Sequence, residues 1–192
     1  MSKDEYLITD APLKALTVFA MPMILGSFFQ QIYNMADSVI VGQFVGSSAL
    51  AAVGATSSLS NLIIGFLMGL SNGFAIITAQ RFGAKDLRGV KKSFAMSLTL
   101  GIAVAAGLTV LGLLFLQPIL RFLNVPENLR TVAGSYIVII IAGLIATFLY
   151  DACAAALRAL GDTITPLVIL AISVILNIAG DLFFCLLYTS DA

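Results

Sequence analysis

The chain has 192 residues, of which 60% are hydrophobic and 10% charged, and its ten basic side chains balance its ten acidic ones. This composition predicts a membrane protein, because a soluble domain of this length could not bury so much apolar surface. The absence of histidine excludes histidine-ligated metals and Ser-His-Asp catalytic triads, and the zero net charge gives no signal for nucleic-acid binding.

Five apolar segments, separated by short polar or Gly/Pro-marked loops, are each long enough to cross a bilayer. They are predicted as helices at residues 13–42, 49–80, 91–116, 131–157 and 165–187. At about 1.5 Å per residue, the first two exceed a hydrocarbon core of about 30 Å, so they should tilt or bend. The predicted fold class is therefore an all-α membrane protein with five transmembrane helices.

The distribution of Lys and Arg predicts how these helices are oriented. Eight of the ten basic residues fall on one side of the membrane: Lys3, Lys14, Arg81, Lys85, Arg88, Lys91, Lys92 and Arg158. That side should be cytoplasmic, which puts the N-terminus inside.

The second segment carries glycine at successive four-residue steps, at Gly65, Gly69 and Gly73. Small residues on one stripe let two membrane helices approach closely. We therefore expect this stripe to pack against a neighbouring helix, with a moving hinge as the alternative.

Polar residues form stripes on the first and fifth segments. Gln30, Asn34 and Asp37 follow one another at helical spacing in the first. Asn177 and Asp181 lie four residues apart in the fifth, hence on one face. Both segments are predicted to run from inside to outside, so both carboxyl groups should lie in the outer half of the membrane.

Tyr136 on the fourth segment should lie at a similar depth. Carboxylates are costly in hydrocarbon, and two that face each other also repel. They could share a proton, or a cation such as Na⁺ could bind the oxygen-rich set of Asp37, Asn177 and Asp181. This predicts a cation- or proton-coupling site. The alternative is that each carboxyl group hydrogen-bonds locally or faces water.

Asp151 is a further acidic residue within a predicted span. It lies about two turns before Arg158, near the predicted cytoplasmic end of the fourth segment. Because a long arginine side chain can reach back toward the membrane, we expect these two residues to form an interfacial ion pair.

Four motifs, "YNMADSVIVGQFVGSSALAAVGAT", "AQRFGAKD", "LRALGDTITP" and "LNIAGDLFF", together resemble the multidrug and toxic compound extrusion (MATE) family of secondary transporters. The resemblance implies two six-helix lobes in the inner (plasma) membrane that export amphiphilic or cationic compounds in exchange for Na⁺ or H⁺. It implies neither enzymatic activity nor a cofactor. It also implies that Asp37, Asn177 and Asp181 form the cation site of the first lobe, with Tyr136 nearby.

This resemblance covers residues 13 to 184, five helices of a six-helix lobe. The sixth helix and the second lobe would be missing, so we expect no transport by the chain alone. The last eight residues, "CLLYTSDA", resemble the translation of a transposon-end sequencing adapter. We therefore expect residues 185–192 to be non-native, the alternative being a native helix end with Tyr188 at the membrane interface.

The favoured hypothesis is an alternating-access antiporter, with Asp37 and Asp181 binding the coupling ion and Gln30 and Asn34 as candidates for lining the substrate cavity. One rival is a flippase for lipid-linked precursors, which would favour basic residues within the helices, whereas here they lie at loops and helix ends. Another is an intramembrane aspartyl protease using Asp151 and Asp181. Those two should lie near opposite membrane faces, whereas a catalytic dyad needs contact.

Overall fold

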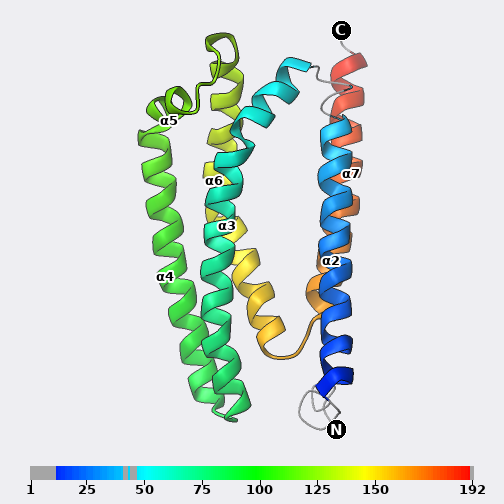
Figure 1. Ribbon diagram of the computed structural model, residues 1–192, viewed down its shortest axis with the longest axis vertical. Helices are drawn as coiled ribbons and strands as arrows, with labels where there is room; N and C mark the ends of the chain where they lie inside the picture. Colours follow the sequence, from blue (N-terminus) through cyan, green and yellow to red (C-terminus); the bar gives the residue numbers. More distant parts are fainter. Residues whose placement is uncertain (1–11, 41–42, 44–46, 191–192) are drawn as a thin grey trace. The chain divides into compact units, whose positions relative to one another are not determined.

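The computed structural model describes residues 12–40, 43 and 47–190, and the regular elements in these ranges are helices (Figure 1). In chain order they are α2 (Pro12–Ile40), α3 (Ser47–Gly83), α4 (Leu87–Leu114), α5 (Leu116–Phe122), α6 (Glu127–Ala159) and α7 (Ile164–Ser190). They form two compact units, a bundle of α3 to α6 and a pair of α2 with α7. The all-α fold predicted from the composition is confirmed for the residues described.

Each of the five predicted segments corresponds to a helix over its described residues, and residues 41 and 42 of the first segment lie outside them. Among the described residues, four stretches are long and apolar enough to cross a membrane: Pro12–Ala36, Thr56–Gly83, Leu87–Leu114 and Leu129–Ala159. A shorter apolar stretch, Ile164–Gly180, belongs to α7. Many large hydrophobic side chains on these helices are exposed, as expected for surfaces that contact lipid acyl chains.

The helix ends differ from the predicted ones where local capping sets them. The third segment was expected to begin at residue 91, but α4 begins at Leu87, because the Asp86 side chain accepts a hydrogen bond from the Gly89 N–H at 2.9 Å. The short helix α5 was not predicted. It lies where a loop was expected, and its Leu120 is fully buried in the bundle.

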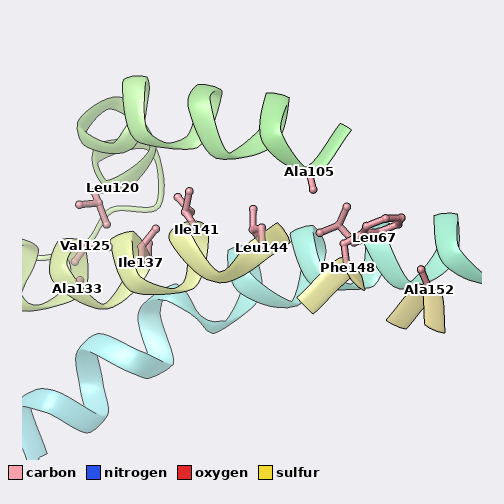
Figure 2. Close-up of a cluster of buried hydrophobic side chains, with 10 residues drawn as sticks. All are labelled: Leu67, Ala105, Leu120, Val125, Ala133, Ile137, Ile141, Leu144, Phe148 and Ala152. Atoms are coloured by element: carbon pink, nitrogen blue, oxygen red, sulfur yellow. The ribbon is translucent and has the colours of Figure 1, made fainter. Parts of the chain in front are cut away.

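The bundle is held by one continuous apolar core (Figure 2). Helix α6 supplies its longest stripe, at steps of three and four residues: Ala133, Ile137, Ile141, Leu144, Phe148 and Ala152. Leu67 comes from α3, Ala105 from α4 and Leu120 from α5, so every helix of the bundle contributes. Because this spacing keeps one face of α6 turned toward its neighbours, α6 organises the bundle.

Helix α4 approaches α6 closely because its buried stripe consists of small residues, Ser97, Gly101, Ala105 and Gly112. The ring of Phe148 occupies the space that a Cβ on Gly101 would need. A Cβ on Gly112 would lie 2.8 Å from Ile141 Cδ1. This contact is reinforced by the Thr109 hydroxyl, which donates a hydrogen bond to the Ile141 carbonyl at 3.2 Å.

The tight packing expected at Gly65, Gly69 and Gly73 is not found within the bundle, and it stays a prediction for helices outside the bundle. Among the described residues, a Cβ on any of these three would meet no heavy atom within 4 Å. At about 100° per residue, Gly69 is about 200° around α3 from Leu67, which is fully buried in the bundle. The glycine stripe therefore lies on the face of α3 turned away from the core, and the small-residue packing is on α4.

Candidate cation-coupling site

The predicted ion ligands of the first and fifth segments lie on the two helices of one compact unit, α2 and α7. The helices run in the same direction (Figure 1). They touch at Gly26, where a Cβ would lie 3.5 Å from Leu170 Cδ2 and 3.7 Å from Leu167 Cδ1. This contact fixes which face of α2 meets α7 and at what height.

The contact at Gly26 sets the register of the polar stripes. Asp37 lies eleven residues beyond Gly26, and Asp181 lies eleven residues beyond Leu170. Eleven residues make about three turns, so each acidic position falls about 16 Å further along its helix and only about 20° around from the contact. On regular helices this register would bring positions 37 and 181 to a similar height on neighbouring stripes, and the approach of the two acidic residues stays a prediction. The side chains of Asp37 and Asp181 lie outside what the structure describes.

Asn177 lies one turn before Asp181 on the same stripe, and its side chain is exposed. Gln30 and Asn34, the candidates for lining a substrate cavity, are also exposed. The Asn34 amide donates a hydrogen bond to Gln31 Oε1 at 3.3 Å. The described part of the pair thus presents amide groups along the helices that carry the two acidic positions.

Tyr136 belongs to the bundle and not to the α2–α7 pair. It lies on α6, half-buried against the apolar core. Its proximity to the cation site stays a prediction.

Asp151 does not form the ion pair that was predicted with Arg158. The ion pairs in the described part of the chain join Arg81 to Asp86 and Arg130 to Glu127. Asp151 is instead 8% exposed, and its Oδ2 has no hydrogen-bond partner among the residues that the structure describes. The prediction failed because Asp151 directly precedes Ala152 of the core stripe, so that packing buries its carboxyl group.

Sequence reasoning also missed buried hydroxyl groups between α3 and α4. Thr78 Oγ1 lies 3.3 Å from Ser93 Oγ, and Thr78 is 2% exposed. Ser71, also 2% exposed, has no hydrogen-bond partner for its hydroxyl in the described part of the chain. The four-residue spacing of Ser93, Ser97 and Gly101 was a signal that could have identified the packed face of α4.

Comparison with known proteins bears on the function of these helices. The MatE family model matches residues 22–183. Among curated proteins, the chain is 32% identical over 165 residues to the "Probable multidrug resistance protein YpnP" of Bacillus subtilis, which covers 86% of the chain and 37% of that protein. It is 24% identical over 180 residues to the "FAD transporter" of Shewanella oneidensis, covering 93% of the chain and 40% of that protein.

The fold is similar to solved transporter structures. One, described as the outward-facing conformation of a multidrug resistance MATE family transporter of the MOP superfamily, superposes with a TM-score of 0.87 at 27% identity. The match covers 94% of this chain and 40% of that one. The chain therefore spans roughly two fifths of the length of the relatives it matches.

Proposed function

Because the chain belongs to the MatE family, we propose that the protein it forms part of is an exporter of drugs or toxic organic cations, driven by Na⁺ or H⁺ entering in exchange. The family consists of multi-pass membrane transporters rather than enzymes, and its members reported above are named for transport or drug resistance. The chain would supply five helices of the first lobe, and the second lobe of the same protein would be its partner.

The observation that carries this proposal is the register of α2 against α7. The Gly26 contact with Leu170 supports a site in which Asp37 and Asp181 approach each other at one height, with Asn177 one turn away. Two carboxylates and an amide offer oxygen ligands that suit Na⁺, and two close carboxyl groups can instead hold one proton between them. We assign Asp37, Asn177 and Asp181 as the coupling site, with Tyr136 as an additional ligand.

Coupling follows from the electrostatics of this pair. As bare anions the two carboxylates repel each other, and a bound Na⁺ or a shared proton removes that repulsion. The ion therefore stabilises the conformation in which the acids are together. A substrate that binds better to the other conformation shifts the equilibrium back and releases the ion. Exchange of ion for substrate across the membrane then follows by alternating access, with Gln30 and Asn34 in contact with the substrate.

The test is efflux by the full-length protein, reconstituted in vesicles loaded with a fluorescent organic cation. An imposed Na⁺ gradient or an imposed pH gradient should accelerate export, and the gradient that does so identifies the coupling ion. Competition by unlabelled FAD asks whether the substrate class includes that of the Shewanella relative. Export that responds to neither gradient would refute the proposal. The present 192-residue chain, reconstituted alone, is expected to insert without transporting.

A further inference from the structure

A groove opens between α3 and α4 at the end of the bundle where these helices are joined, the lower end in Figure 1. Its volume is about 590 Å³. Three basic side chains line it, Arg81 from α3 and Arg88 and Lys92 from α4. It belongs wholly to the bundle and shares no residue with the candidate coupling site.

The groove carries a net positive charge. Its one acidic residue, Asp86, is engaged by its neighbours: Oδ1 accepts the Gly89 N–H at 2.9 Å, and Oδ2 lies 3.5 Å from Arg81 Nη1. Arg88 and Lys92 are exposed, and neither takes part in an ion pair with a described residue. Two cations one turn apart on α4 are therefore available to an anion entering the groove.

Apart from Ser93 and Ser97, the rest of the groove is apolar, and it extends into the membrane-spanning stretches of both helices. Along α4, Arg88, Lys92, Met96 and Leu100 follow at four-residue steps, so one stripe changes from charged to apolar. Met96 and Leu100 are 55% and 52% exposed. Both lie within the span Leu87–Leu114. The apolar part of the groove is thus at the depth where lipid acyl chains are the surrounding solvent.

Phe74 and Ile77 of α3 form the facing wall. They lie before Arg81 on α3, and Met96 and Leu100 lie after Lys92 on α4. On both helices the apolar residues are therefore further than the basic ones from the turn that joins α3 to α4. Both walls therefore have the same polarity, charged at the helix ends and apolar inward. A ligand that matches this pattern carries a negative group attached to a hydrocarbon chain.

We propose that the groove binds one anionic phospholipid, with its phosphate between Arg88 and Lys92 and an acyl chain along Met96, Leu100 and Ile77. Basic clusters beside membrane helices attract anionic head groups, and guanidinium groups bind phosphate oxygens in pairs. A free phosphate ion would leave the apolar walls unused. A zwitterionic lipid would fill the apolar walls but would gain less from the net positive charge.

The experiment uses the full 192-residue chain in lipid vesicles. The chain contains no tryptophan, so the single variant Met96→Trp places one fluorescent reporter in the groove. Lipids with brominated acyl chains quench tryptophan on contact. Brominated phosphatidylglycerol should therefore quench this reporter more strongly than brominated phosphatidylcholine at equal mole fraction. We expect a relative binding constant of about fivefold or more in favour of phosphatidylglycerol, reduced by added salt.

The matched variants separate a specific site from general surface charge. Arg88→Gln with Lys92→Gln should bring the relative binding constant close to one. The double variant with Lys85→Gln and Lys91→Gln also removes two positive charges from this end of the bundle, but from residues that do not line the groove. It should keep most of the preference for phosphatidylglycerol. Far-UV circular dichroism checks that both double variants are folded.

Three further outcomes would overturn the proposal. Millimolar inorganic phosphate should leave the quenching unchanged, because the acyl chain contributes to binding; displacement by phosphate would indicate a simple anion site and overturn the lipid assignment. Equal quenching by the two lipids, or equal loss of preference in both double variants, would also overturn it.

Discussion

The bundle and the α2–α7 pair differ in what their helices bury. Apart from Ala15, the buried hydrophobic side chains of the described residues belong to the bundle. Both units expose large apolar side chains, such as Met35 in the pair and Phe122 in the bundle, and the pair carries the acidic and amide residues predicted to bind the ion. The buried apolar core thus lies in one unit, whereas the two acidic positions of the candidate coupling site lie in the other. Substitutions in the bundle core should therefore act mainly on stability, and substitutions of the predicted acidic ion ligands mainly on coupling.

The largest expected effect is on coupling. Asp37→Asn in the full-length protein removes the charge at constant size, so the ion site loses one of its two anions. We expect gradient-driven efflux to fall to the level of protein-free vesicles, while membrane insertion and helix content are unchanged.

The control for this variant is Asp162→Asn, the same carboxyl-to-amide change before the start of α7, where asparagine also caps helices well. It should keep coupled efflux. Undiminished coupled efflux in Asp37→Asn would show that the pair does not carry the coupling chemistry.

The second prediction tests the bundle as the stable unit. In Gly101→Ala the new methyl group meets the Phe148 ring, and overpacking of this kind costs about 1–3 kcal/mol. The free energy of unfolding of the chain, measured by titrating SDS into detergent micelles and following far-UV circular dichroism, should fall by that amount.

Gly69→Ala is the matched control, the same change on the face of α3 where a Cβ meets no heavy atom. It should leave stability unchanged or raise it by up to about 1 kcal/mol, because alanine favours a helix over glycine. Equal losses in the two variants would mean that α3 and α4 do not differ in packing as the structure describes.

These two glycine positions also show what the sequence could and could not predict. Hydropathy and length identified the five apolar helices, because each must be long and apolar to cross a membrane. Spacing identified Gly65, Gly69 and Gly73 as one stripe of α3, but a stripe has the same spacing whether it faces protein or lipid. Which face is buried depends on the neighbouring helices, and single-helix periodicity does not contain that information.

Single-helix periodicity is equally limited at the candidate coupling site, where it gives the polar stripes but not the packing between helices. The stripe of Gln30, Asn34 and Asp37 and the spacing of Asn177 and Asp181 follow from helical periodicity alone. Whether the two stripes meet depends on the register set by the contact of Gly26 with Leu170, which no motif marked. Asp151 was paired with Arg158 from spacing along one helix, whereas its burial comes from packing in the bundle. The cap that Asp86 forms at the start of α4 could have been predicted from the sequence, but the predicted start at residue 91 did not take it into account.

The third prediction concerns the start of α7 within the pair. Asp162 Oδ1 accepts hydrogen bonds from the N–H groups of Ile164 and Thr165, at 3.1 and 3.0 Å. Asp162→Ala leaves these donors without that acceptor and should cost about 1 kcal/mol. Hydrogen exchange should increase in the first turn of α7 and stay unchanged in α6. Faster exchange throughout the bundle would show that the two units do not unfold separately.

The smallest expected effect is at Ser71 in the bundle, whose hydroxyl is buried and has no hydrogen-bond partner among the described residues. An unsatisfied buried hydroxyl costs free energy, and alanine removes it with little loss of volume. Ser71→Ala should therefore raise the free energy of unfolding by up to about 1 kcal/mol in the same SDS titration. Ser97→Ala, which removes a buried hydroxyl that donates to the Ser93 carbonyl at 2.8 Å, should give no such gain. A loss of stability in Ser71→Ala would mean that this hydroxyl is hydrogen-bonded in the membrane, for example through a water molecule, and that the bundle core is more polar than its side-chain packing indicates.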